Sequence, residues 1–189
     1  KHGVNANGKT AASKAGRAAG SHSVPLSVVL EAGPLPPRRA LELVREVARI
    51  LALRDQQGMP LGRPVPQAIL VSPDSQDRMV SIDPPAEARD LPSPEELVMH
   101  LGALLYECLT GLPAASGGSS SKRLPTPSRI RPDIHPDVER ICLAAMGSST
   151  GKAPGQRFGW LVNRGHRYAG PAELADDIDR FLDGRRLSM

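Results

Sequence analysis

The sequence predicts a mainly α-helical domain with one small β-hairpin, preceded by a basic N-terminal segment. Four segments repeat apolar residues with helical periodicity, and two short apolar runs flank a Pro-Asp turn. Aromatic residues make up only 3% of the 189 residues, beside 19 prolines and 18 glycines, a composition typical of elements joined by long irregular connections. This length favours one domain with tails.

Proline at the start and glycine at the end mark several of the predicted helices. These helices occupy residues 36–53, 94–109, 135–146 and 171–184. In the first, one apolar face is formed by Ala40, Val44, Val47, Ala48 and Leu51. The second is apolar on nearly every side, at Leu97, Val98, Leu101, Leu104, Leu105, Cys108 and Leu109, so we expect it to be central and buried.

Two short strands and a long loop complete the expected folded part. Ala68–Val71 and Met79–Ile82 are predicted to pair around the Pro-Asp turn. Residues 113–128, rich in Ser, Gly and Pro, are predicted to be a loop.

The positive charge of the chain is concentrated at its N-terminal end. Residues 1–22 carry four basic side chains, Lys1, Lys9, Lys14 and Arg17, and no acid, which leaves 20 basic against 20 acidic residues in the remainder. We expect 1–22 to be a flexible basic tail, separate from a domain at 23–187. Such a tail can contact nucleic-acid phosphates non-specifically, but it lacks aromatic residues for stacking on bases, so this binding is expected to be weak.

Two short motifs match catalytic patterns without their structural context. Gly3–Thr10 fits the phosphate-loop pattern, but no strand precedes it and no large apolar residue follows it to dock a helix. Gly147–Gly151 fits the nucleophile-elbow pattern, but it follows a predicted helix instead of a strand. We interpret both as loop sequence.

The cysteines and histidines indicate no metal or disulfide framework. Cys108 and Cys142 fall inside apolar helical patterns, as buried thiols of a reducing compartment do, which favours a cytoplasmic location. The five histidines form no pair at metal-ligand spacing, so we expect neither metal nor cofactor. No apolar run is long enough to span a bilayer, and no secretory signal is visible.

From Ser23 to about Leu187 the order of elements resembles the C-terminal lobe of bacterial serine/threonine protein kinases. The resemblance rests on LEAGPLPPRRALELVREVARILAL, HLGALLYECLTGLP, PSRIRPDIHPDVERICLAAM and HRYAGPAELADDIDRFL, in this order. The second of these is similar to the central helix of the lobe, whose kinase form reads S-L-G-x-x-L-Y-E-x-L-T-G-x-P. Nothing before Ser23 fits an N-terminal lobe, so the resemblance implies a C-lobe alone.

The resemblance also implies which positions have lost their catalytic groups. The kinase segment G-I-V-H-R-D-L-K-P-x-N-I-L lies over residues 58–70, with Leu61 at the histidine and Arg63 at the aspartate that accepts the substrate proton. Val65 replaces the lysine, and Ala68 replaces the asparagine that holds a second magnesium ion. A guanidinium cannot act as a base, so we expect no catalysis.

Two further positions of the kinase pattern are also changed. Asp83 stands where the metal-binding aspartate would be, but prolines follow it instead of Phe-Gly, and a role as a turn residue is the favoured interpretation. Leu97 replaces the aspartate by which the central helix holds the catalytic loop, and only thirteen residues, Pro84–Glu96, remain for an activation segment.

A kept scaffold without catalytic groups implies a pseudokinase that acts as a protein-interaction, scaffolding or regulatory module, with ATP binding not expected. Without an N-terminal lobe, apolar residues at Met59, Leu61, Val65 and Leu70 would face water and form an interface, unless the Pro-rich loop covers them. Two alternatives are a structural protein that binds nucleic acid through its tail, and a kinase half completed by a partner chain.

The resemblance finally implies a buried ion pair that ties the lobe together. Glu95 or Glu96 would supply the glutamate that closes the activation segment, and Arg167 the arginine before the last helix, with Arg157 as its rival.

Overall fold

The computed structural model describes residues 23–59, 61–72, 80–82, 92–114, 124–147 and 168–188. The tail 1–22, Asp83, Arg157 and Arg167 lie outside these ranges, so the predictions made for them stay predictions. The elements in order are β1 (Val24–Pro25), α1 (Leu26–Glu31), α2 (Pro37–Gln56), the 3-10 turn η1 (Pro66–Ala68), β2 (Ile69–Val71), β3 (Val80–Ile82), α3 (Pro94–Thr110), α4 (Pro127–Ile130), α5 (Pro136–Gly147) and α6 (Pro171–Leu182).

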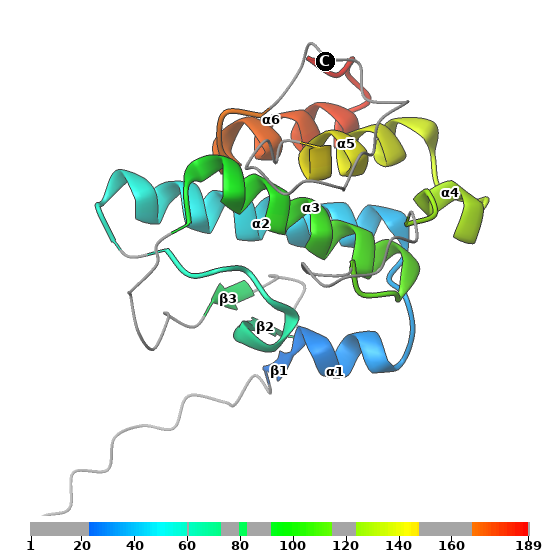
Figure 1. Ribbon diagram of the computed structural model, residues 1–189, viewed down its shortest axis with the longest axis horizontal. Coiled ribbons are helices and arrows are strands. Elements are labelled where there is room, and N and C mark those ends of the chain that lie inside the picture. Colours follow the sequence, from blue (N-terminus) through cyan, green and yellow to red (C-terminus); the bar gives the residue numbers. More distant parts are fainter. Residues whose placement is uncertain are drawn as a thin grey trace, which may run out of the picture.

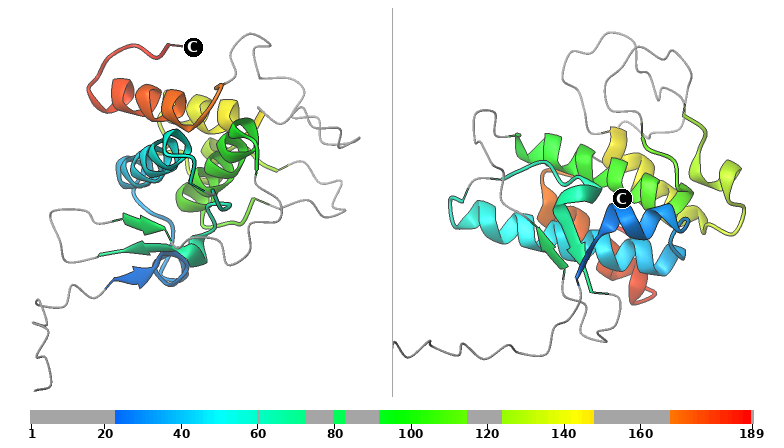
Figure 2. Two further views of the ribbon diagram at one scale, coloured as in Figure 1. Left: turned by 90° about the vertical axis from the view of Figure 1, so that its left-hand side faces the viewer. Right: turned by 90° about the horizontal axis from the view of Figure 1, so that it is seen from below.

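The described elements form three layers, which can be followed in Figures 1 and 2. Helices α2 and α3 lie side by side in the middle layer. Helices α5 and α6 cover one side of this pair, and the small sheet with α1 lies on the other side. The contacts agree, since α6 packs on α2, α5 packs on α3, and β3 packs on α2.

Helix α3 has the central position that its apolar pattern predicts. Ser93 begins it with a capping box, in which its hydroxyl accepts from the Glu96 N–H and its own N–H donates to the Glu96 carboxylate. The seven apolar positions named from the sequence are all buried, which confirms the prediction. The helix ends at Gly111, whose left-handed φ of 72° suits glycine at this cap.

Helix α2 confirms the first helical pattern, predicted at residues 36–53. Two prolines at its start supply a first turn that needs no N–H donor. The five residues of its predicted apolar face, from Ala40 to Leu51, are completely buried. Beyond the helix, Gly58 takes a left-handed φ of 65° and turns the chain towards the sheet.

The predicted hairpin is present and carries one additional strand. β2 and β3 are antiparallel, with Ile69 opposite Ile82 and Val71 opposite Val80. β1 pairs antiparallel with the other edge of β2, where Val24 lies opposite Val71, so the sheet order is β1-β2-β3. A two-residue strand has no periodicity of its own and forms only because β2 offers an unpaired edge.

The last described elements close the helical layers. α5 and α6 match the third and fourth helical patterns, and Gly184 after α6 has a left-handed φ of 70°. One prediction needs correction, because the last two residues of the predicted loop 113–128 begin the short helix α4. A contact with α5 stabilises this short helix, because the Ser128 N–H donates to the Glu139 carboxylate over 2.8 Å.

Candidate functional site

The candidate site is the catalytic-loop-like segment, residues 61–71, together with the start of α3. The segment leads from the turn after α2 through η1 into β2. Leu61 (6% exposed), Pro64 and Ile69 are buried and fix it to the core. The side chains between these three buried residues are exposed or half-buried.

Arg63 is an exposed cation that faces the first turns of α3. Burial lowers the pKa of His100 below its usual value of 6.5, and the charge of Arg63 lowers it further, while Glu96 opposes the shift. The charges of Arg63 and Glu96 therefore both act on His100, in opposite directions. At the position where the resemblance expects a proton-accepting carboxylate, the structure has an exposed guanidinium whose charge lowers the pKa of His100.

The neighbouring positions hold apolar groups. Val65 is 42% exposed, and Ala68 is half-buried at the end of η1, where its N–H donates to the Val65 carbonyl over 3.0 Å. Leu97 on α3 is completely buried among core residues. A side chain in this position fills space in the core and offers no hydrogen bond to the segment.

The four residues proposed as an apolar interface fall into two groups. Met59 (47% exposed) and Val65 present apolar surface to water. Leu70 is half-buried, and Leu61 is buried, so the expectation that Leu61 faces water is wrong. Leu61 belongs to the hydrophobic core and anchors the start of the segment there.

Arg131 is a structural residue that the sequence interpretation missed. Its guanidinium donates to the carbonyl oxygens of Leu35 (2.7 Å) and Leu109 (3.1 Å), and it pairs with both carboxylate oxygens of Asp133. It thereby joins the connection after α4 to the start of α2 and the end of α3. The available signal was the spacing R-x-D in RIRPDIHPD, which fits a local arginine–carboxylate fork.

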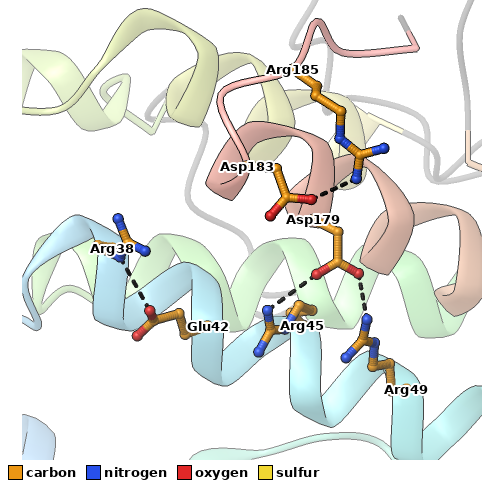
Figure 3. Close-up of polar contacts among 7 residues, drawn as sticks. All are labelled: Arg38, Glu42, Arg45, Arg49, Asp179, Asp183 and Arg185. Carbon is orange, nitrogen blue, oxygen red and sulfur yellow. Dashed lines mark hydrogen bonds and ion pairs between the residues drawn. The ribbon is translucent and has the colours of Figure 1, made fainter.

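A second polar cluster joins α2 to α6 (Figure 3). Asp179 on α6 accepts from Arg45 (3.1 Å) and Arg49 (2.6 Å), which are one turn apart on α2. Arg45 and Asp179 are largely shielded from water, and the Arg45 Nε is buried without a hydrogen-bond partner. The pair orients two packed helices, a contact between residues 134 positions apart that no local pattern predicts.

Asp177, also on α6, is a completely buried carboxylate. It accepts a hydrogen bond from the Tyr168 hydroxyl over 3.2 Å and bonds from the backbone and hydroxyl of Ser188. Burial raises the pKa of Tyr168, and the nearby Asp177 charge raises it further, so this phenol stays a hydrogen-bond donor.

Only the two glutamates of the predicted ion pair lie within the described residues. Glu95 and Glu96 lie in the first turn of α3, where Glu96 closes the capping box with Ser93. Arg167 lies outside the described residues, so its pairing with either glutamate stays a prediction.

Both cysteines are buried free thiols, as predicted. Burial raises the pKa of Cys108 to about 12, and it raises that of Cys142 as well. The Cys142 thiol contacts the Gly102 carbonyl at 3.7 Å, across the interface between α5 and α3. Within the described ranges, no three His, Cys, Asp or Glu side chains come together as metal ligands.

Solved kinase domains share this architecture. The kinase domain of Mycobacterium tuberculosis PknI matches with a TM-score of 0.59 and 18% identity, over 84% of this chain and 62% of that domain. A double mutant of the same domain matches with a TM-score of 0.59 and 16% identity, and a single mutant with 0.56 and 19%. The fold is protein-kinase-like.

This likeness confirms the predicted mainly helical, kinase-like fold. It is a likeness of fold alone, since identity lies between 16% and 19%, and the chain spans about three fifths of the matched kinase domains. No protein-family model matches the sequence, and no curated protein does. None of the helices in the described ranges combines the length and apolarity needed to cross a bilayer.

Proposed function

We propose that the chain is a non-catalytic, pseudokinase-like module that binds another protein and is built on a kinase C-terminal lobe. The observation that carries the proposal is Arg63. It occupies the position of the catalytic base in the resemblance, and its positive charge acts on His100 at the start of α3. A guanidinium stays protonated in proteins and cannot accept the proton of a substrate hydroxyl.

The other replaced positions support the same conclusion. Phosphoryl transfer depends on positioning the phosphates and stabilising their charge. The isopropyl group of Val65 offers no charge to a phosphate, and the methyl group of Ala68 offers no ligand to magnesium. Leu97 is an apolar core residue where a kinase would hold its catalytic loop by a carboxylate.

The binding role draws on the exposed apolar side chains of the same region. Met59 precedes the catalytic-loop-like segment and Val65 lies within it, and each is more than 40% exposed. A protein partner that covers them would remove apolar surface from water and gain about 25 cal/mol for each Å² buried. Arg63 lies between them in the sequence and adds a charge that favours an acidic rim on the partner.

The first experiment tests whether the chain binds nucleotide. Thermal melts with millimolar Mg-ATP, and with magnesium alone as the control, should give the same melting temperature. A nucleotide present at a hundredfold above its dissociation constant would add about 2.7 kcal/mol of stability. A reproducible rise of several degrees with Mg-ATP would contradict the proposal and favour a kinase half completed by a partner chain.

The second experiment tests the interface. The tagged chain is used to capture proteins from an extract of its own cells, in parallel with the variants Met59→Asp and Val65→Asp. Leu112→Asp is the matched control, because Leu112 is equally exposed (48%) but follows the far end of α3. We expect a captured partner to be lost with the first two variants and kept with the third. A partner that all three variants retain would show that this region is not the interface.

A further inference from the structure

The segment after α6, residues 185–188, is held to the side of α6 by the buried Asp177. The Ser188 N–H donates to Asp177 Oδ1 over 2.9 Å, and the Ser188 hydroxyl donates to the same oxygen. The other carboxylate oxygen accepts from Tyr168. Leu187 packs against the core, and the Arg185 N–H donates to the Arg180 carbonyl over 2.7 Å at the start of the segment.

The sequence of this segment, Arg185-Arg186-Leu187-Ser188, places two cations just before an exposed serine. Arg185 pairs with Asp183 at 2.6 Å (Figure 3), but both side chains are about 60% exposed. Pairs in water contribute little, so this contact does not prevent Arg185 from binding elsewhere. Guanidinium groups at fixed spacing from a hydroxyl are the feature that an acidic peptide-binding groove selects.

We propose that Ser188 is phosphorylated by an arginine-directed serine/threonine kinase, and that the phosphate releases residues 185–188 from α6. In the reaction, Ser188 Oγ forms a bond to the γ-phosphorus of ATP held by that second enzyme. The bond from this phosphorus to the bridging oxygen breaks, ADP leaves, and the hydroxyl proton passes to the base of the modifying kinase. The proposal is independent of the binding partner proposed above.

Release follows from the charge that the phosphate would bring to Asp177. The modification removes the Ser188 hydroxyl donor and adds a charge of about −1.5 to −2. Asp177 is completely buried, so the two anions would share a site with little water to screen them. Undocking places the phosphate in water and costs the Ser188 hydrogen bonds, the Leu187 contact and, where the whole segment leaves, the bond from the Arg185 N–H to the Arg180 carbonyl.

The docked segment is also able to reach a kinase groove. Ser188 lies at the surface in an irregular segment, so presenting it requires local opening and no unfolding of a helix. Opening would uncover Asp177 Oδ1 on α6, the oxygen that Ser188 occupies in the docked segment. Phosphorylation would therefore change the face of α6 that residues 185–188 cover into an open face that carries the Asp177 carboxylate.

The first test asks whether the site is used. The full chain is incubated with Mg-ATP and the catalytic subunit of cyclic-AMP-dependent protein kinase as the arginine-directed probe, and phosphate is mapped by mass spectrometry. We expect phosphate on Ser188, its loss in Ser188→Ala, and a rate lower by about tenfold or more when Arg185 and Arg186 are both alanine. Arg140→Ala, an exposed arginine of α5, is the control and should leave the rate unchanged. A wild-type chain without phosphate on Ser188 would overturn the proposal.

The second test asks whether the phosphate releases the segment. Hydrogen–deuterium exchange of a peptide covering residues 183–188 should become faster by about tenfold or more after phosphorylation, because the charge-assisted bond of the Ser188 N–H is lost. Ser188→Asp should act in the same direction, whereas Ser81→Asp, which adds the same charge at an exposed serine of β3, should not. Peptides of α3 report that the core is intact. A phosphorylated chain with unchanged exchange over 183–188 would overturn the release.

Discussion

Replacing Gly102 by alanine is the substitution that tests the packing of this fold most directly. Gly102 lies in the middle of α3, where α5 crosses it. A Cβ at this position would lie 2.7 Å from the Met146 nitrogen and 2.9 Å from both the Ala145 carbonyl carbon and the Ala145 Cβ. None of these atoms can rotate away, because two belong to the backbone of α5 and the third is fixed to it.

The expected loss of stability follows from two opposing effects. In an exposed helix interior, alanine would stabilise by about 1 kcal/mol relative to glycine. Here the two helices must separate to admit the methyl group, and inserting such a group into a packed core typically costs about 1–3 kcal/mol. Separation also weakens the dispersion contacts of the buried residues along the interface. We therefore expect Gly102→Ala to lower the free energy of unfolding by about 1–2 kcal/mol net, or about 2–8 °C in melting temperature.

Urea unfolding followed by far-ultraviolet circular dichroism measures this difference. Gly170→Ala is the matched control, because Gly170 has an extended φ and its added Cβ would meet only Pro94 at 3.7 Å, an ordinary contact. Its expected loss is about 1 kcal/mol at most, from a weaker helix cap. A Gly102→Ala chain as stable as the wild type or more so would refute the close crossing of α3 and α5.

Three more predictions concern the backbone contacts of Arg131, the two buried thiols and the tail at residues 1–22. Arg131→Ala should cost about 2–4 kcal/mol in urea unfolding, because it leaves two backbone carbonyls without their donor, whereas Arg140→Ala at an exposed pair should cost less than about 1 kcal/mol. An unfolded thiol ionises near pH 9.0, while burial keeps Cys108 protonated to about pH 12 and Cys142 is shifted in the same direction. The free energy of unfolding should therefore fall as pH rises above 9.0, by up to about 1.4 kcal/mol per pH unit for each thiol, and a flat profile between pH 8 and 10.5 would contradict their burial. Deleting residues 1–22 should leave the melting temperature unchanged and abolish weak, salt-sensitive binding to nucleic acid, and a lower melting temperature would show that the tail is part of the fold.

Local pattern alone was sufficient for the helices and for the central position of α3. Its apolar residues surround the whole helix, and only a helix enclosed by other elements can bury such a surface. Pro94 marked its start in the sequence, and the structure adds a capping box between Ser93 and Glu96. The kinase-like fold was predicted from the resemblance of four segments, in their order, to the C-terminal lobe of bacterial serine/threonine protein kinases.

Contacts distant in sequence were not predictable in the same way. Arg131, Asp177 and Asp179 look like ordinary charged residues in a polar segment, and only the fold brings each to its partners. β1 is too short to show periodicity and forms because β2 has a free edge. Leu61 is a further case, because its apolar character fits either an exposed interface or a covered position, and only the structure shows that it is 6% exposed.

The sequence by itself determined which chemistry the candidate site can offer, because residue type decides whether a base, a phosphate ligand or a metal ligand exists. Arg63, Val65 and Ala68 carry no carboxylate, amine or amide there in any conformation. Only the tertiary structure decided where those side chains point and what surrounds them. The lowered pKa of His100 beside Arg63 and the docking of Ser188 on Asp177 depend on burial and distance, which arise when elements far apart in the chain are packed together.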